Sequence, residues 1–221
     1  MSESSSPLPT LGFMEKYALS LDDFGRSGLK WAKLVKSEGT HGLPDTYLLA
    51  NAKGEGPGHF RIYWCQYTKD AVYSISLYHG ADFMFTPKMN GCSFAVGMPT
   101  PEGNILVGHA NVHDSTRPEI LAIDEELEAK NLSMQKTLQL LDIRRDLVRS
   151  VQFLMLHREF EGRGVAVKKQ LNTTNTAYTS SASGIITFGI RDTAADGIKW
   201  RFYFQTKDRQ NRVTGVHKIK K

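Results

Sequence analysis

The sequence predicts an α+β protein, an antiparallel β-sandwich with helices packed on the outside. Two patterns support this prediction. Short runs rich in β-branched and aromatic residues, separated by turn residues, occur up to about residue 112 and again after residue 164. Between Arg117 and Glu161, apolar residues instead recur at steps of three and four, as on one face of a helix. Sheet-forming segments on both sides of one helical segment are typical of an α+β arrangement.

The N-terminal region shows little regular patterning. Residues 1–10 are polar and Ser-rich and lack the basic and apolar regions of a secretory signal peptide, so we expect a disordered leader there. Residues 11–221 are of a length that one core can accommodate, and we expect them to form a single domain. Glycines interrupt residues 11–43 repeatedly, which predicts turns with one short helix at residues 29–35.

The later elements follow from hydrophobic periodicity and turn residues. Strands are predicted at residues 47–51, 59–67, 71–78, 83–86, 93–97 and 105–112, and again at residues 165–171, 184–191, 199–206 and 212–219. A long helix is predicted to begin near Ser133 and to end before Gly162. The polar residues 172–181 are predicted to form a mobile loop of the kind that often borders a functional site.

Composition and charge argue against several function classes. No apolar run approaches the ~20 residues that span a bilayer, so we expect a soluble protein without a membrane span. The net charge is +5, with cations concentrated near the C-terminus, but no nucleic-acid reader motif accompanies them. We interpret this end as a solvated tail and expect no nucleic-acid partner. The cations of this tail are Lys207, Arg209, Arg212, Lys218, Lys220 and Lys221.

The two cysteines predict free thiols in a reducing compartment, because a chain of this size does not depend on disulfides. Cys65 lies in a run crowded with aromatic residues and is interpreted as a buried core thiol. His109, His113 and Asp114 lie in a strand-like segment, where positions four apart are separated by about 13 Å, too far to share one ion. We therefore expect neither a metal nor a cofactor.

Cys92 is the residue that most suggests chemistry. The runs at residues 93–97 and 105–112 flank a turn rich in proline and glycine, which predicts a hairpin centred near residues 100–101. In that register Cys92 lies directly opposite His109, and the two side chains share a face. A thiol attacks as its thiolate, and a neighbouring imidazole is a suitable base. Gly91 would let backbone amides approach a substrate carbonyl, so Asn90, Gly91 and Ser93 are predicted to form the turn at an oxyanion site.

The segment from Asp82 to Asp114 resembles the active-site region of Burkholderia lethal factor and, more distantly, the catalytic domain of the cytotoxic necrotizing factors. Those toxins are cysteine-dependent glutamine deamidases, with a Leu-Ser-Gly-Cys turn and a histidine on the neighbouring strand. Here residues 89–92 read Met-Asn-Gly-Cys, and Thr86 stands six residues before the cysteine, as in the lethal factor. Asn90 replaces the family's serine, and the interval from Cys92 to His109 is longer, which implies an inserted loop at residues 98–103.

The resemblance implies a toxin-like catalytic domain in which Cys92 is the nucleophile, His109 the base, and Thr86 orients the histidine or donates to the oxyanion. Its partner would be a host protein carrying a target glutamine. The chain would be made in a bacterial cytoplasm without a Sec signal and would act in a reducing compartment, the host cytosol after export. As an enzyme it is also compatible with cysteine proteolysis or transglutamination.

A non-enzymatic reading also fits the sequence. In it the chain is a β-rich interaction module, Cys92 is a small buried hydrophobe, and His109 is a hydrogen-bonded core histidine. The interaction surface would then be the basic tail together with Tyr63, Trp64 and Tyr67 of the aromatic strand.

Overall fold

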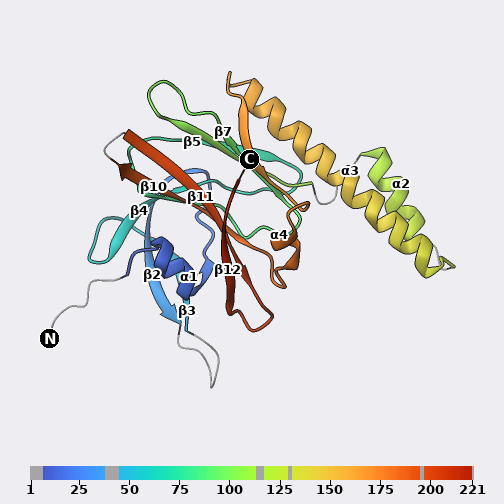
Figure 1. Ribbon diagram of the computed structural model, residues 1–221, viewed down its shortest axis with the longest axis horizontal. Coiled ribbons are helices and arrows are strands. Elements are labelled where there is room, and N and C mark those ends of the chain that lie inside the picture. Colours follow the sequence, from blue (N-terminus) through green and yellow to red (C-terminus); the bar gives the residue numbers. More distant parts are fainter. Residues whose placement is uncertain (1–6, 38–44, 113–116, 129–130, 195–196, 221) are drawn as a thin grey trace.

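The computed structural model describes residues 7–37, 45–112, 117–128, 131–194 and 197–220 and shows a mixed α and β protein with two β-sheets (Figure 1). The larger sheet has eight strands, in the order β1 (Ala18–Leu21), β3 (Thr46–Ala52), β2 (Gly28–Ser37), β4 (His59–Trp64), β6 (Phe83–Phe85), β10 (Ile186–Ala194), β11 (Gly197–Lys207) and β12 (Val213–Lys218). The smaller sheet has four, in the order β5 (Val72–Leu77), β8 (Ile105–Ala110), β7 (Ser93–Gly97) and β9 (Val167–Leu171). The helices are α1 (Leu11–Lys16), α2 (Pro118–Leu127), α3 (Met134–Glu161) and α4 (Thr176–Ser180).

The larger sheet is mixed and strongly curled, which differs from the purely antiparallel sandwich that the sequence predicts. The pairs β1–β3 and β4–β6 are parallel. The curl brings the two ends of the sheet together, and Gln205 on β11 bridges them: its amide nitrogen donates to the carbonyl oxygens of Met14 (2.6 Å) and Tyr17 (2.8 Å), and its oxygen accepts from Leu19 N–H (3.1 Å). The sheet is therefore nearly barrel-shaped.

Alternation along β11 divides the apolar side chains between two cores. Tyr203 faces the concave side of the larger sheet, where it packs with Phe188 and other aromatic residues. Phe202 and Phe204 face the opposite way, into a core shared with the smaller sheet, where the ring of Phe202 lies 6.0 Å from that of Phe94 on β7. The two sheets are thus joined through one apolar layer.

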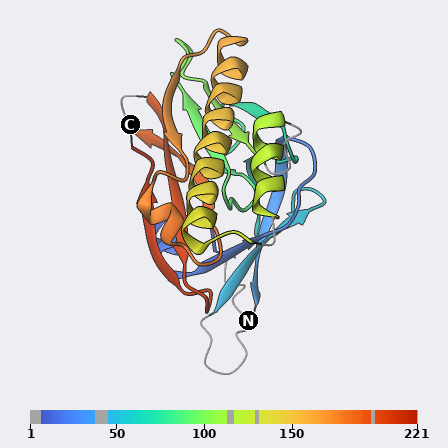
Figure 2. The ribbon, with the colours of Figure 1, turned by 90° about the vertical axis from the view of Figure 1, so that its right-hand side faces the viewer.

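Helix α3 packs on the outer face of the smaller sheet, and α2 lies beside its first half (Figure 2). Leu156 and Phe160 of α3 pack against the smaller sheet, whose Gly108 leaves room for the ring of Phe160. The predicted start of this helix is confirmed, because the Ser133 hydroxyl accepts a hydrogen bond from Lys136 N–H at 3.2 Å. Gly162 caps the other end, also as predicted.

The predicted helix at residues 29–35 is wrong, and two other segments contain helices that the sequence did not predict. Residues 29–35 belong to strand β2, which pairs with both β3 and β4, and its buried Ala32 and Leu34 follow the two-residue period of a strand. The first helix is instead α1, which begins at the Thr10 cap inside the predicted leader; residues 1–6 of that leader lie outside the described part of the chain. Residues 172–181 also contain a helix, α4, which Asn175 caps and which buries Tyr178.

The basic tail also differs in part from its prediction. Lys207 is 5% exposed, and its ammonium donates to the carbonyl oxygen of Leu19 at 3.0 Å, so it belongs to the seam that closes the larger sheet. Of the three aromatic residues proposed as an interaction surface, Tyr63 and Trp64 are buried in the two cores and only Tyr67 is exposed.

Candidate functional site

Strands β7 and β8 form the predicted hairpin, with a register that differs from the prediction by two residues. Phe94 lies opposite His109, and Ser93 lies opposite Ala110, so the hairpin is centred between Pro101 and Glu102. Thr100 and Asn104 still pair across the turn, with a bond of 2.8 Å from Thr100 N–H to the carbonyl oxygen of Asn104, so the turn itself is residues 101–103. Continuing this register places Cys92 opposite Asn111.

Cys92 and His109 are therefore diagonal neighbours on the same face of the sheet and not directly opposed residues. Such diagonal positions have Cα atoms about 7–8 Å apart, within reach of side chains that turn toward each other. The N–H of Asn111 donates to the carbonyl oxygen of Ala71, which lies on the side of β8 away from β7. Cys92 and Asn111 therefore form a non-hydrogen-bonded pair, the type of cross-strand pair whose side chains lie closest. The sulfur of Cys92 accordingly lies 3.6 Å from Asn111 Oδ1, to which the thiol donates.

The Cys92 thiol is held in its neutral form. The residue is 4% exposed, and this burial raises the pKa of the thiol to about 11, while a hydrogen bond from the backbone N–H of Asn90 to the sulfur lowers it in part. Cys65 is fully buried, and burial raises its thiol pKa to about 12. Cys92 is therefore the less buried of the two thiols and the more easily ionised.

His109 is fixed by Thr86. The threonine Oγ1 and the histidine Nδ1 are 2.6 Å apart, and both residues are buried. Burial lowers the pKa of the imidazole to about 3, so the ring is neutral at physiological pH. The other ring nitrogen, Nε2, is buried and has no hydrogen-bond partner in the described part of the chain. The ring of Tyr67 packs against the imidazole with 5.4 Å between centroids.

The backbone turn at Cys92 is held by side chains from two helices, α3 and α4. Gly91 has φ of +87°, a conformation that favours glycine. Gln152 on α3 donates to the carbonyl oxygen of Gly91 (3.0 Å) and accepts from the hydroxyl of Ser93 (2.6 Å). The phenol of Tyr178 on α4 donates to the carbonyl oxygen of Cys92 at 3.1 Å. Ser93 thus supports the turn through Gln152.

The backbone amides of this turn face the phenol of Tyr178. Hydrogen bonds from the N–H groups of Gly91 and Cys92 lower the pKa of that phenol in part, against the larger rise that burial causes. Beside the turn lies an open pocket of about 260 Å³, lined on one side by Asn90, Gly91 and Asn111 and on the other by α3 and Thr173. The pocket therefore reaches Asn90 and Gly91 of the predicted oxyanion turn, whereas Cys92 and His109 do not line it.

The structure thus brings Thr86 and His109 into contact, and places Cys92 on the same face without a hydrogen bond to His109. Sequence reasoning did not identify the partners that complete the site, which are Asn111, Tyr67, Gln152 and Tyr178. Asn111 had a usable signal, because it lies two residues after His109 in an apolar strand and so shares its face. Tyr178 and Gln152 carried none, since both reach the turn from distant elements.

Metal binding has no support among the described residues, which contain no group of three His, Cys, Asp or Glu side chains placed to hold an ion. His113 and Asp114, considered above as possible ligands together with His109, lie outside the described part of the chain. None of the helices among the described residues is long and apolar enough to span a membrane.

Comparison of the sequence with protein-family models and with curated proteins gives no match.

Proposed function

We propose that this protein is a glutamine deamidase in which Cys92 is the nucleophile and His109 the base. The observation that carries the proposal is the buried Thr86–His109 pair, 2.6 Å between Oγ1 and Nδ1, on the same sheet face as a cysteine preceded by a glycine with φ of +87°. An imidazole fixed through one nitrogen, with its other nitrogen unpaired, is what a general base requires.

The proposed reaction replaces the carboxamide of a protein glutamine with a carboxylate. With its proton on Nδ1 and that bond accepted by Thr86, His109 keeps a lone pair on Nε2 and takes the proton of the Cys92 thiol. The sulfur attacks the carboxamide carbon, backbone amides of the turn bind the oxyanion, and His109 returns a proton to the departing ammonia. Water, deprotonated by His109, then attacks the thioester, releasing glutamate and restoring the thiol. The net change is addition of one water and loss of one ammonia.

The resting site needs one rearrangement for this reaction. The thiol donates to Asn111 Oδ1, and a thiol with a pKa near 11 beside an imidazole with a pKa near 3 does not form an ion pair. In the proposed mechanism a bound carboxamide engages Asn111, and the thiol turns to the diagonal His109. Proton transfer then accompanies attack, as in general-base catalysis.

The wider assignment rests on the resemblance to the lethal factor and is proposed with the activity. It includes a β-sandwich architecture, a host protein as substrate and action in the host cytosol after export. The apolar layer shared by the two sheets, with α3 on the outside, supports that architecture. The longer interval between Cys92 and His109 corresponds to the turn at residues 98–104. This turn lies at the end of the hairpin away from Cys92, so it leaves unchanged the sheet face that carries Cys92 and His109.

The direct test measures glutamine conversion. Purified protein is incubated with a glutamine-containing peptide and with cytosolic protein, and both ammonia release and conversion of glutamine to glutamate by mass spectrometry are followed. We expect turnover by the wild type and none by Cys92→Ala or His109→Gln. Addition of a primary amine distinguishes transglutamination, and peptide cleavage would indicate proteolysis. Undiminished conversion by Cys92→Ala would rule out this mechanism.

One observation favours a second function, an interaction module with an inert thiol, namely the raised pKa of Cys92 together with its hydrogen bond to Asn111. Alkylation by iodoacetamide separates the two, with Cys65 as an internal control. If the protein is a deamidase, we expect Cys92 in the folded protein to be alkylated much faster than Cys65. The alkylation rate of Cys92 should rise about tenfold per pH unit toward pH 11 and should be lower in His109→Gln. If the thiol is inert, both cysteines should be alkylated together and only when the protein unfolds.

A further inference from the structure

One face of α3 leads from the candidate site outward into solvent. Gln152, which holds the Cys92 turn, lies on this face, and residues at steps of three and four toward the N-terminus of the helix continue it. In order from the site, they are Arg149, Arg145, Leu141, Leu138 and Met134. The face extends for about 27 Å from Gln152 to Met134 at the rise of an α-helix.

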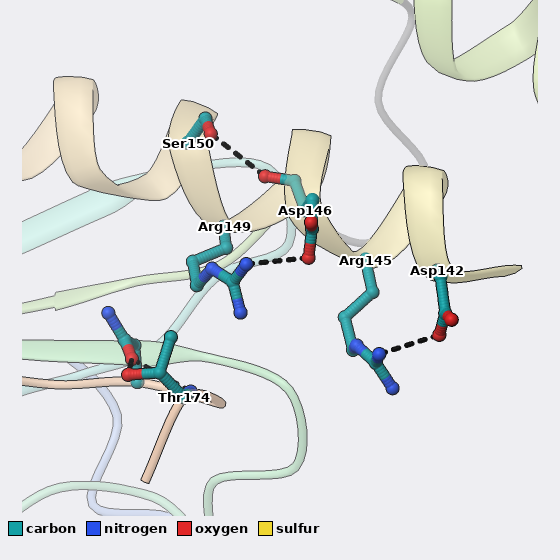
Figure 3. Close-up of polar contacts among 7 residues, drawn as sticks. Asp142, Arg145, Asp146, Arg149, Ser150 and Thr174 are labelled. Carbon is teal, nitrogen blue, oxygen red and sulfur yellow. Dashed lines mark hydrogen bonds and ion pairs between the residues drawn. The ribbon is translucent and has the colours of Figure 1, made fainter.

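The part of this face nearest the site carries two guanidinium groups. Arg145 and Arg149 both line the pocket beside Gly91, and Figure 3 shows them projecting from the helix on the side where Thr174 lies. Their neighbour Arg144 also lines the pocket, but it makes a two-point ion pair with Asp124 on α2 (2.5 and 3.0 Å).

Each of the two arginines retains unused donors. Arg145 donates through one terminal nitrogen to Asp142 (2.6 Å), and Arg149 through one terminal nitrogen to Asp146 (2.5 Å). The remaining N–H groups of both have no partner among the described residues. The side chains of Asp142 and Asp146 are 67% and 63% exposed, and such surface ion pairs are weak, so an incoming carboxylate can bind the same guanidinium groups.

The distal part of the face is apolar and exposed. Met134 is 81% exposed, Leu138 55% and Leu141 47%, and Leu141 also lines the pocket. Apolar side chains that continue directly from a pair of arginines are unsuited to a nucleic-acid backbone, which would require further cations there. They suit a protein surface that combines carboxylates with an apolar side chain.

From these observations we propose that the α3 face formed by Met134, Leu138, Leu141, Arg145 and Arg149 docks an acidic segment of the substrate protein. Carboxylates that flank the target glutamine bind Arg145 and Arg149, and an apolar residue further along the substrate packs on Leu138 and Met134. This assignment rests on the proposed function, because it makes the pocket beside Gly91 the place where the glutamine enters on its way to Cys92.

The test uses two fluorescein-labelled peptides with one central glutamine, one flanked by glutamates and the other by lysines. Binding to the Cys92→Ala protein is measured by fluorescence anisotropy at low and high salt. We expect the acidic peptide to bind at least about tenfold more tightly than the basic one, and added salt to weaken its binding. Arg145→Gln/Arg149→Gln removes this preference, and Arg145→Glu/Arg149→Glu reverses it, a gain that a misfolded protein would not show.

The matched control is Arg158→Glu/Arg209→Glu. It makes the same change of net charge at two exposed arginines, one on another side of α3 and one in the turn after β11. We expect the control to bind both peptides as the parent does. Equal binding of the two peptides by the parent, or equal loss in the control, overturns the proposal. Tighter binding of a labelled oligonucleotide than of the acidic peptide, lost in the same variants, also overturns it.

Deamidation by the wild type is measured separately on the same peptides. Selective binding of the acidic peptide without any conversion would retain the docking face and reject the deamidase. Conversion of both peptides at equal rates, unchanged in Arg145→Gln/Arg149→Gln, would retain the deamidase and reject the docking face.

Discussion

The hydrogen bond between Thr86 and His109 is the most specific arrangement at the scale of single residues. Thr86 immediately follows β6 of the larger sheet, and His109 lies on β8 of the smaller one, so the bond joins the two sheets inside an otherwise apolar layer. A buried imidazole nitrogen without a partner costs about 1–3 kcal/mol, and the hydroxyl removes that cost for Nδ1 while fixing the ring. The same bond therefore contributes to stability and to the orientation of the proposed base.

Thr86→Val tests both roles. The change keeps the shape of the side chain and removes the hydroxyl, so Nδ1 of His109 loses its partner. We expect the free energy of unfolding, from urea denaturation, to fall by about 1–3 kcal/mol, and the rate of glutamine conversion to fall at least about tenfold. Thr86→Ser keeps the hydroxyl and should restore most of both. Loss of stability with unchanged conversion would mean that Thr86 has only a structural role.

The sequence predicted which of the candidate residues share a sheet face, but it placed Cys92 opposite His109, two residues from its partner Asn111. The Thr86 interval from Cys92 and the strand parity of Cys92 and His109 were available from the sequence, because alternation fixes which residues share a face. The register was not, since it depends on how residues 98–104 close the turn, and the extra pairing of Thr100 with Asn104 moved Asn111 opposite the thiol. The supporting side chains from α3 and α4 depend on tertiary contacts that a single sequence does not encode visibly.

At the scale of elements, α3 determines the form of the site. Its Gln152 holds the turn before Cys92, and the position of the whole helix depends on close contact with the smaller sheet at Gly108. A Cβ at that glycine would lie 2.7 Å from Cε2 of Phe160 and 3.0 Å from Cδ2 of Leu156, both shorter than a normal contact. The glycine is therefore required for the helix to pack where Gln152 can reach the turn.

Gly108→Ala should push α3 away from the sheet. We expect a loss of about 1–3 kcal/mol in the free energy of unfolding, as for overpacked cores, together with faster alkylation of Cys92 because the turn loses support from Gln152. Gly54→Ala is the control, since nothing lies within 4 Å of a Cβ at that position and surface changes of this kind stay within about 0.5 kcal/mol. If both variants have wild-type stability, the helix has more freedom on the sheet than these contacts allow.

Helices and strands were predicted well where the hydrophobic periodicity was strong. They were predicted poorly where pairing with distant strands determined the secondary structure. Residues 93–97 form β7 with the predicted limits, and the Ser133 cap marked the start of α3 correctly. Residues 28–37 contain Lys30, Lys33 and Lys36 between apolar positions, a spacing that also fits a helix. Hydrogen bonding to β3 on one side and β4 on the other made this segment a strand, and a single sequence does not show those partners.

At the scale of the whole molecule, the curled sheet and its two cores bury several ionisable groups in their neutral forms. Cys65, Cys92 and His109 all lie against the layer between the sheets, and burial shifts the pKa of each away from its charged form. The seam that closes the larger sheet buries Lys207, and burial likewise lowers its pKa, with Lys88 adding to the effect. The free energy of unfolding must therefore depend on pH through these buried groups, which a count of surface charges does not include.

His109 gives the clearest prediction of this kind. Its pKa is near 6.5 in an unfolded chain and about 3 in the folded protein, so between these values the unfolded state binds the proton that the folded state excludes. The contribution is fully present above pH 6.5 and is lost as the pH falls toward 3. Each pH unit within that window costs up to about 1.4 kcal/mol, which amounts to about 2 kcal/mol between pH 7 and pH 5.

The measurement compares urea denaturation of the wild type and of His109→Gln at pH 7 and pH 5. Glutamine does not titrate and can still hydrogen-bond to Thr86, while all carboxylate contributions are common to the two proteins. We expect the wild type to lose about 2 kcal/mol more than the variant over this interval, whatever their difference at pH 7. Equal losses would mean that the buried imidazole accepts a proton in the folded state, and an ion pair with Cys92 would then replace general-base catalysis as the mechanism to test.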